Sequence, residues 1–391
     1  MRRLLYSLLL ISLAVVGCNT NAIKVAQIND SIDSLKVKFA PDPRVAVFDV
    51  KAIESGNAVV VRGEVDNPNA KRALLDALKN QDVTDAVDSV VLLPQASLGP
   101  RVFGIVDVSV GNMYDAPKYA TQMVSQVLLG HTVKVLKEVK GWYYVKSEIN
   151  YLGWIEPGNI VRVDSAELAA YNAERKLIVT SVYATVYASP SDRGVSVSDA
   201  VMANLLKPLG TVGPNYKVQM PDGRTGYIAA SDAEYYDQYL AAHKPTPEGI
   251  EKVAMKLIGV PYLWGGTSAK GVDCSGFCKT VFRMNGIRLP RDASQQVNVG
   301  EQVDPGPNFV NLRKGDLLFF GKKAGEGKPE KIVHAAIYLG NGYFIQSSGR
   351  VRISSLVKGD SAFDQYDLDR FVTARRVLPP SETILEKGNN N

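Results

Sequence analysis

The sequence predicts an α+β protein of several domains: a small α/β unit, two small β-barrels and a C-terminal α+β domain. Three observations lead to this class. Short β-branched runs separated by Gly, Pro, Asn and Asp turns fill much of the first two thirds of the chain. Part of this region is repeated at a constant offset. The last third combines a cysteine at a helix start with two strands joined by a tight turn.

The composition is ordinary for a globular chain, with 46% hydrophobic and 22% charged residues among 391. This length allows two to four domains, each with its own core. The formal net charge of +5 is too small to indicate nucleic-acid binding, but it mildly favours an anionic polymer such as a cell wall. No His/His/acid cluster of a zinc peptidase is present, and we expect a monomer without metal or cofactor.

Residues 1–18 have the pattern of a secretory signal. Two arginines precede an apolar run from Leu4 to Val16, which ends in Gly17 and Cys18. The run is shorter than the roughly 20 apolar residues of a membrane-spanning helix. Its ending resembles a bacterial lipobox, which implies that Cys18 carries a lipid and anchors the protein on the periplasmic or cell-surface side of a bacterial membrane. An ordinary cleaved signal with a stray cysteine is the alternative.

Residues 19–44 are expected to form a tether, polar at first and weakly helical further on. Residues 45–99 carry two strand patterns, a helix pattern and a third strand pattern, which predict a small β-β-α-β unit. These patterns are Val45–Phe48, Ala58–Val65, Asn69–Asn80 and Asp88–Leu93. The order resembles the BON-like modules of envelope proteins. We expect a spacer or docking module without chemistry of its own.

An internal repeat follows, at an offset of 73 positions without a gap. Each copy consists of short strands separated by turns, which indicates a small barrel. The aligned segments are Tyr114-Asp-Ala-Pro117 with Tyr187-Ala-Ser-Pro190, and Gly153-Trp-Ile155 with Gly226-Tyr-Ile228. The pattern resembles tandem bacterial SH3-like domains at residues 101–164 and 170–233. Neither copy contains a nucleophile–base pair, so we expect binding modules.

A predicted helix within residues 245–380 begins with the candidate nucleophile, Cys274. A cysteine nucleophile reacts as the thiolate, so its site must favour the thiolate and supply a base. Asp273 is a good N-cap, which places Cys274 where unpaired backbone N–H groups and the helix dipole should lower the thiol pKa. Gly286 is a natural end for this helix. Cys278 lies one turn further on and is expected to be a core residue.

The candidate base is His334, because it is the only one of the three histidines in this domain. It lies in a strand-like run, and a Gly-Asn-Gly turn brings the chain back as a partner strand. In such a hairpin residue 346 lies opposite or diagonal to residue 334. Gln346 could therefore accept a hydrogen bond from the distal imidazole nitrogen and orient the ring, as the third member of a triad does. Ser347 and Ser348 are the alternatives for this role.

The C-terminal domain contains five short motifs, Pro261-Tyr-Leu-Trp-Gly-Gly266, Asp273-Cys-Ser-Gly-Phe277, Leu289-Pro-Arg-Asp-Ala-Ser294, Gly315-Asp-Leu-Leu-Phe-Phe320 and His334-Ala-Ala-Ile-Tyr-Leu-Gly340. In order and spacing they resemble the NlpC-type, papain-like cysteine peptidases of peptidoglycan. With two SH3-like domains before it, the chain is similar to γ-D-glutamyl-L-diamino acid endopeptidases. The resemblance implies a triad of Cys274, His334 and a third polar residue, which is usually a histidine. Gln346 departs from that usual choice.

The resemblance also implies how one end of the substrate is held. In relatives with this domain order, the first barrel closes the pocket and selects a free N-terminal L-Ala. Asp273 would pair with the substrate ammonium. From the barrel, Tyr151 would reach the same end, and Gln122 falls where a glutamate is usual, which would loosen the requirement for a free amine. The peptidase positions expected to contact L-Ala-γ-D-Glu are Tyr262, Asp273, Ser275 and Ser294.

We therefore expect a lipid-anchored envelope cysteine peptidase that cleaves the γ-D-glutamyl–diamino acid bond of peptidoglycan stem peptides. A wall-binding scaffold with a vestigial site is one alternative. An amidase or acyltransferase that uses the same cysteine and histidine is another. The residues fit either diaminopimelate or lysine after D-Glu, and either intact wall or released fragments.

Overall fold

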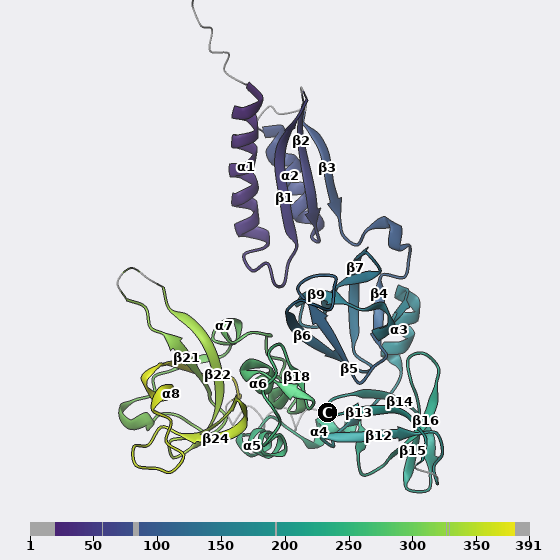
Figure 1. Cartoon of the computed structure of the whole chain (residues 1–391), viewed down its shortest axis with the longest axis vertical. Coiled ribbons are helices and arrows are strands. Elements are labelled where there is room, and N and C mark those ends of the chain that lie inside the picture. Colours follow the sequence, from purple (N-terminus) through teal and green to yellow (C-terminus); the bar gives the residue numbers. More distant parts are fainter. Residues whose placement is uncertain are drawn as a thin grey trace, which may run out of the picture. The chain divides into compact units, whose positions relative to one another are not determined.

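The computed structural model describes residues 20–56, 58–80, 86–191, 194–325, 327 and 329–379. The chain divides into two compact units, Met1–Leu93 and Pro94–Asn391 (Figure 1). The predicted α+β class is confirmed, since several short helices accompany five separate sheets in the described part of the chain. None of the helices in these residues is long and apolar enough to cross a membrane. Cys18, the expected lipid attachment site, lies outside the described residues.

The first unit is a three-stranded sheet covered by helices. β1 (Phe48–Ser55) pairs antiparallel with β2 (Ala58–Val65), and β2 pairs parallel with β3 (Val87–Leu92). α2 (Pro68–Asn80) connects β2 to β3 and buries one apolar stripe with four-residue spacing against the sheet. The β-β-α-β order is the one that the sequence predicts.

α1 (Thr20–Phe39) corrects the expectation of a tether over residues 19–44. Its Ile28 and Ile32 are fully buried in the same core as the sheet. The Asn29 side chain also accepts a hydrogen bond from the Ala52 backbone N–H at 2.9 Å. A short apolar stripe among polar residues gives little sequence signal, because most of the stability of such a helix comes from packing on its neighbours.

Two seven-stranded sheets with equivalent strand orders explain the internal repeat. The orders are β10-β4-β7-β8-β9-β5-β6 and β17-β11-β14-β15-β16-β12-β13. The first residues of β5 to β9 precede those of β12 to β16 by the same 73 positions. The strands of the first sheet are β4 (Phe103–Val106), β5 (Val110–Tyr114), β6 (Met123–Leu128), β7 (Thr132–Val139), β8 (Trp142–Ser147), β9 (Leu152–Ile155) and β10 (Ile160–Val163). Those of the second are β11 (Leu177–Val179), β12 (Tyr183–Tyr187), β13 (Ser196–Val201), β14 (Leu205–Val212), β15 (Asn215–Gln219), β16 (Thr225–Ala229) and β17 (Ala233–Tyr235).

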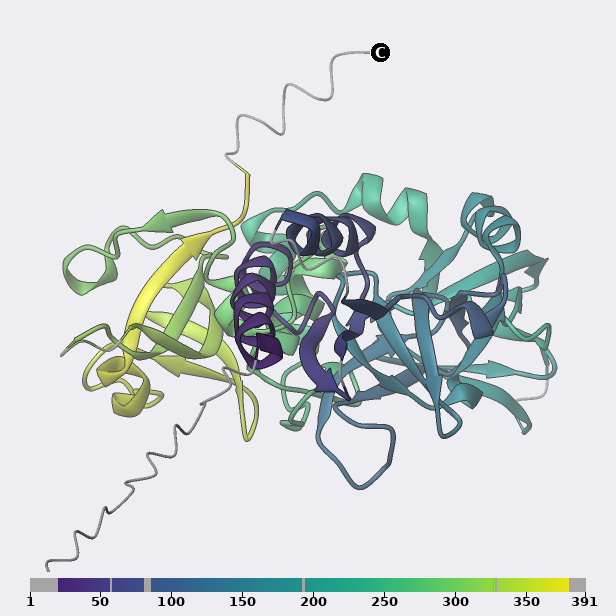
Figure 2. The same cartoon turned by 90° about the horizontal axis from the view of Figure 1, so that it is seen from above.

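The C-terminal domain packs helices against a six-stranded antiparallel sheet of order β20-β25-β21-β22-β23-β24. Figure 2 shows the long strands of this sheet, green to yellow, as a curved layer. α6 is buried along almost its whole length and packs against β22 and β23. The helices are α5 (Pro247–Lys256), α6 (Cys274–Met284), α7 (Ala293–Gln296) and α8 (Gln365–Asp369). The strands are β20 (Glu301–Val303), β21 (Leu317–Lys322), β22 (Lys331–Gly340), β23 (Tyr343–Ser348), β24 (Arg350–Ser355) and β25 (Phe371–Arg376).

Candidate active site

α6 begins at Cys274, as the sequence predicts, and Asp273 caps it. The Asp273 carboxylate accepts a hydrogen bond from the Gly276 N–H at 2.7 Å. Gly276 lets the helix start pack directly on the preceding loop, because a Cβ there would lie 2.0 Å from the Gly266 carbonyl oxygen. Cys274 is thereby held in the first helical turn, whose backbone N–H groups have no partner within the helix.

Burial opposes the expected activation of the Cys274 thiol. The residue is 7% exposed, and burial raises the pKa of its thiol to about 11, with the charge of Asp273 adding to the rise. The backbone N–H groups of Ala335 and Ser275 and the Arg291 guanidinium act in the opposite direction. The helix start acts in the expected direction through the Ser275 N–H, but burial disfavours the thiolate more than these groups favour it, so the pKa of the thiol is raised rather than lowered. A nearby base has to accept the proton as the sulfur reacts.

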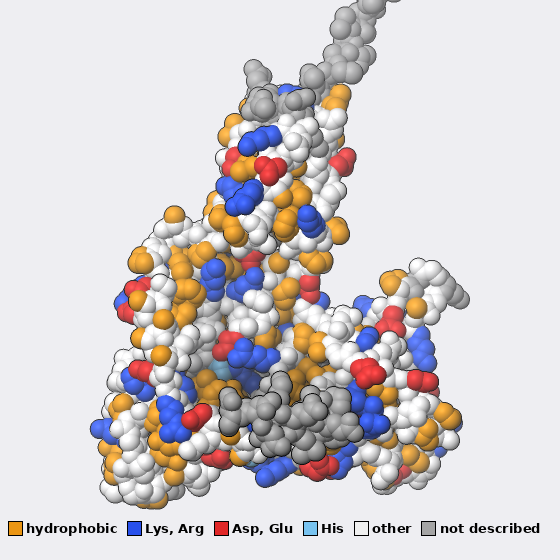
Figure 3. Space-filling view, turned by 180° about the vertical axis from the view of Figure 1, so that it is seen from behind, with side chains coloured by type: hydrophobic (Ala, Val, Ile, Leu, Met, Phe, Trp, Pro, Cys, Tyr) orange, Lys and Arg blue, Asp and Glu red, His pale blue; other side chains and the backbone are white. Residues whose placement is uncertain are grey.

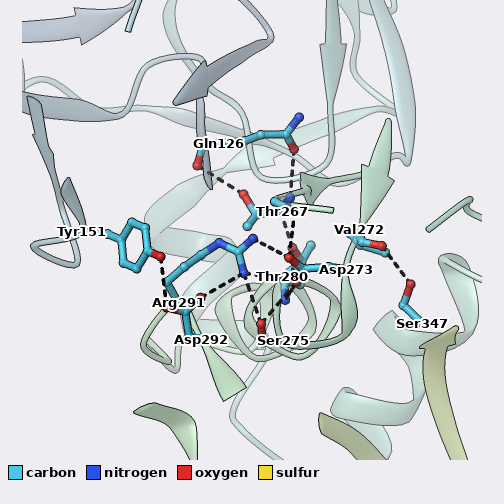
Figure 4. Close-up of polar contacts among 12 residues, drawn as sticks. Gln126, Tyr151, Thr267, Val272, Asp273, Ser275, Thr280, Arg291, Asp292 and Ser347 are labelled. Atoms are coloured by element: carbon cyan, nitrogen blue, oxygen red, sulfur yellow. Dashed lines mark hydrogen bonds and ion pairs between the residues drawn. The ribbon is translucent and has the colours of Figure 1, made fainter. Parts of the chain in front are cut away.

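His334 lies on β22, and Gln346 on β23 holds its ring. The predicted hairpin is present, with residue 346 diagonal to residue 334, and Gln346 Oε1 lies 2.6 Å from His334 Nε2. Nδ1 is then the ring nitrogen that can accept a proton. Of the alternatives, Ser347 donates its hydroxyl to the Val272 carbonyl at 2.8 Å (Figure 4), and Ser348 is the half-buried last residue of β23.

The imidazole of His334 is suited to accept a proton at neutral pH. Burial is the main cause that lowers its pKa below the ordinary 6.5, and the Arg370 guanidinium lowers it further. Asp367, Gln346 and Asp364 act in the opposite direction without reversing the shift. The ring is therefore neutral at pH 7, with Nε2 bonded to Gln346.

Cys274 lies close to the strand that carries His334, and Tyr262 lies close to Cys274. The backbone N–H of Ala335, the residue after His334, forms a hydrogen bond with the Cys274 thiol. Burial raises the pKa of Tyr262 to about 12, and the neighbouring Cys274 and Asp273 add to this rise. Tyr262 is therefore a protonated phenol, and thus a hydrogen-bond donor, beside the sulfur at neutral pH.

Asp273 has a cationic partner within the protein, Arg291, whose side chain is 2% exposed. Arg291 Nη1 lies 3.1 Å from Oδ1 and Nη2 2.5 Å from Oδ2, while the Gly265 N–H donates to Oδ2 at 3.0 Å (Figure 4). Ser275, predicted to contact substrate, is buried in the same network and donates to Oδ1 at 3.2 Å. The Asp273 charge is thus compensated inside the protein, rather than available for a substrate ammonium as we expected.

The first barrel reaches the peptidase domain through Tyr151 and Gln126. The Tyr151 hydroxyl donates to Asp292 Oδ2 at 3.0 Å, next to Arg291 (Figure 4). Gln126 accepts from the Thr267 N–H at 2.8 Å, and its backbone carbonyl accepts from the Thr267 hydroxyl. The Gln122 side chain, which we expected near the substrate amine, is exposed in the loop before β6, and it is Gln126 that contacts Thr267.

Another contact fixes the far end of α6 to the first barrel. Arg283 donates to Glu148 at 2.9 Å, and the His131 ring lies 2.8 Å from the same carboxylate. Burial alone would raise the pKa of Glu148, but His131 and Arg283 hold it well below its usual range. The C-terminal end of α6 therefore contacts the first barrel directly, whereas near its start the barrel contacts Thr267 and Asp292, which lie outside the helix.

The remaining predicted positions differ in exposure. Cys278 is fully buried in the core, as expected. Ser294 lies on α7 with its side chain exposed. Within the described ranges, no group of three or more His, Cys, Asp and Glu side chains is arranged to hold a metal ion.

A cysteine at the start of a buried helix, a histidine on an antiparallel strand and an amide on its ring are the arrangement of papain-like peptidases. Residues 259–371 match the NlpC/P60 family, and residues 113–160 match the bacterial dipeptidyl-peptidase SH3 domain. Gamma-D-glutamyl-L-lysine dipeptidyl-peptidase of Bacillus cereus is 30% identical over 66% of this chain and 77% of its own length. The chain therefore belongs to the NlpC/P60 family of peptidases.

One further relative and one solved structure match a similar share of the chain. Dipeptidyl-peptidase 6 of Lysinibacillus sphaericus is 26% identical over 69% of this chain and 97% of its own length. The crystal structure of an NlpC/P60 family protein from Bacillus cereus has a TM-score of 0.61 and 25% identity, and it covers 71% of this chain and 100% of its own.

Several residues of this site do not follow from the sequence. Arg291 and Asp292 lie inside a motif that the sequence singles out, so the motif marks them without revealing their partners. Gln126 gives no local signal, because only docking of the barrel brings it to Thr267. Asp367 and Arg370 belong to a helix and turn beyond β24 and are brought to Gln346 by the fold alone.

Proposed function

We propose that the protein is a cysteine endopeptidase that cleaves the γ-D-glutamyl–diamino acid bond of peptidoglycan stem peptides with a free N-terminal L-Ala. The observation that carries this proposal is the position of the first barrel. Its Tyr151 and Gln126 contact the peptidase domain beside the network that caps Cys274. A barrel in this position suits an active site that closes around one end of a short peptide. The names of the Bacillus cereus and Lysinibacillus sphaericus relatives support the same activity.

In this proposal Cys274 attacks the γ-carbonyl of D-Glu while its thiol proton passes to Nδ1 of His334. The backbone N–H groups at the start of α6 and the Tyr262 hydroxyl donate to the developing oxyanion. His334 then gives the proton to the leaving amine of the diamino acid, and the C–N bond breaks to leave a thioester on Cys274. A water molecule, deprotonated by His334, attacks the thioester and releases L-Ala-γ-D-Glu with the free thiol.

The substrate ammonium needs an acidic partner other than Asp273, whose charge Arg291 already compensates. Asp292, the next residue in the sequence, contacts the barrel and lies 4.0 Å from Arg291 Nη1, farther than the 2.5 Å of the Asp273 pair, and its side chain is 25% exposed. We assign the ammonium contact to Asp292, held in place by the Tyr151 hydroxyl. The first barrel would then close the pocket, and the carboxylate that pairs with the free amine would come from the peptidase domain.

The proposed place of action is the cell envelope, with Cys18 as the lipid attachment site. Figure 3 shows acidic and basic side chains interspersed over the face in view, without the large basic surface of a nucleic-acid binder. We expect the Cys18→Ala variant to be absent from the membrane fraction after cell fractionation, while the purified variant keeps full peptidase activity. A membrane-bound Cys18→Ala protein would contradict lipid anchoring at this residue.

The test of the proposed activity is a panel of defined substrates. We expect release of L-Ala-γ-D-Glu from the free tripeptide L-Ala-γ-D-Glu-diaminopimelate or its lysine counterpart. In this proposal the barrel closes the pocket behind a free N-terminus. The same peptides with an acetylated N-terminus, and intact wall, should therefore be cleaved poorly. Rapid cleavage of intact wall would overturn the assigned role of the barrel. A different product would identify an amidase or acyltransferase, and no product from any substrate would favour a scaffold.

A further inference from the structure

A buried chain of hydrogen bonds continues behind the His334–Gln346 pair. Gln346 Nε2 donates to Asp367 Oδ2 at 2.7 Å and to the Ser354 hydroxyl at 3.0 Å, and Asp364 Oδ2 lies farther from it, at 3.4 Å. The Asp367 side chain is 2% exposed and belongs to α8. Arg370 in turn donates to Asp367 Oδ1 through Nε at 2.8 Å and through Nη2 at 2.5 Å. A single connected path therefore joins Arg370, Asp367, Gln346 and His334.

The chemistry of this path determines which way the Gln346 amide points. A carboxylate accepts hydrogen bonds and does not donate them, so the side of the amide that faces Asp367 has to be the NH₂ group. If the amide turned over, its carbonyl would face the carboxylate and both oxygens would lose their donor. The carbonyl therefore faces His334, and His334 has to carry its proton on Nε2 to bond with it. Nδ1 then keeps its lone pair.

We propose that Asp367 is a positioning residue that fixes the Gln346 amide and, through it, the proton-accepting tautomer of His334. A neutral glutamine needs such a partner, because the oxygen and the NH₂ group of its amide are similar in shape but differ in hydrogen bonding. Arg370 holds Asp367 in place, and Ser354 accepts the second amide proton. The kinetic consequence of this role rests on the proposed peptidase function, whereas the tautomer itself does not.

Asp367→Asn removes the acceptor-only group at nearly constant volume. The new amide can donate to the Gln346 carbonyl, which turns the Gln346 NH₂ group toward His334 and favours a ring whose proton is on Nδ1. We expect kcat/KM of the tripeptide to fall about 10- to 100-fold, a size typical for the loss of an outer partner of a functional histidine. KM should change little. The acidic limb of the pH profile of kcat/KM should move to lower pH, because Asp367 raises the His334 pKa; Arg370, which lowers this pKa, and Asp364, which raises it less than Asp367 does, stay in place.

A double variant, Gln346→Glu with Asp367→Asn, provides the rescue. The carboxylate introduced at position 346 accepts from His334 Nε2–H with one oxygen. Its other oxygen accepts from the amide introduced at position 367, so the pattern of donors and acceptors is restored. We expect the double variant to recover most of the activity lost in Asp367→Asn, with the acidic limb moved to higher pH by the new carboxylate. A purely structural role for Asp367 predicts neither the recovery nor the opposite shifts of the limb.

Asp316 offers a matched control. It is also buried and also paired with an arginine, Arg376, through Nε at 2.9 Å and Nη2 at 2.7 Å. Asp316→Asn should destabilise the same domain without moving the pH profile of the folded protein. An equal pH shift in Asp316→Asn and Asp367→Asn would overturn the proposal.

A measurement of the ring itself separates this inference from the proposed function. The ¹⁵N shifts of the three histidines distinguish the two neutral tautomers, and a His334→Gln variant identifies the relevant signals. In the wild-type protein we expect His334 to be protonated on Nε2, and in Asp367→Asn a substantial share on Nδ1. An unchanged tautomer would refute the role of Asp367 whether or not the protein cleaves the tripeptide. Absence of cleavage by the wild-type protein would refute the function and leave the tautomer result intact.

Discussion

Replacing Arg291 by methionine removes the cation that compensates the buried carboxylate of Asp273. Removing one member of a buried ion pair typically costs about 3–5 kcal/mol of folding free energy, because the other charge stays buried without compensation. The Gly265 and Gly276 N–H groups and the Ser275 hydroxyl still donate to Asp273 after the change. The loss should therefore be near the lower end, at about 3 kcal/mol.

Urea unfolding followed by tryptophan fluorescence is a suitable assay, because all three tryptophans, Trp142, Trp154 and Trp264, lie in the second unit. The control is Asp273→Asn combined with Arg291→Met, in which neither charge remains and the asparagine still caps α6. We expect this double variant to regain at least half of the stability lost by Arg291→Met. A loss below about 1 kcal/mol in Arg291→Met, or a double variant no more stable than the single one, would refute the reasoning.

Three further predictions concern the reacting groups. Since burial and the Arg370 charge lower the His334 pKa more than Asp367 and Asp364 raise it, the neutral base persists as pH falls. The acidic limb of kcat/KM should therefore lie below pH 6.5, and a limb above pH 7 would contradict this. Tyr262→Phe should lower kcat/KM about 100-fold with KM nearly unchanged, as for loss of one oxyanion donor, and steady-state kinetics on the tripeptide checks it. Because burial raises the Cys274 pKa to about 11, the sulfur is protonated at neutral pH, and iodoacetamide labelling in a His334→Ala protein should rise about tenfold per pH unit. Cys278 should label far more slowly in the folded protein, because it is fully buried.

The sequence predicts those parts of the fold whose signals are local. The β-β-α-β order of the first unit, the cap at Asp273 and the hairpin of His334 and Gln346 follow from turn residues, spacing and capping chemistry. The repeat at 73 positions corresponds to equivalent strand orders because aligned residues occupy equivalent strands. The helical tendency of α1 is visible in the sequence, but its place in the core is not, because its two buried isoleucines are recognisable as core residues only once the sheet is present.

The site shows the same division between local and long-range information. The identities of Cys274 and His334 are visible in the sequence, but the protonation of the thiol depends on burial, which spacing does not encode. The partner of Asp273 is equally hidden, since α6 and the loop after it separate Arg291 from Asp273 in the sequence, without a regular spacing. Charge compensation inside a protein is a property of the packed structure, so an acidic residue next to a nucleophile does not by itself indicate a substrate contact.

The most direct test of the proposed activity is product analysis by mass spectrometry on the free tripeptide L-Ala-γ-D-Glu-diaminopimelate. The wild-type protein should release L-Ala-γ-D-Glu and free diaminopimelate, and Cys274→Ala should release neither while it unfolds at the same urea concentration. Cys278→Ala, the matched control within the same helix, should keep the wild-type products. Undiminished cleavage by Cys274→Ala, or cleavage at a bond other than the γ-D-glutamyl amide, would contradict the proposal.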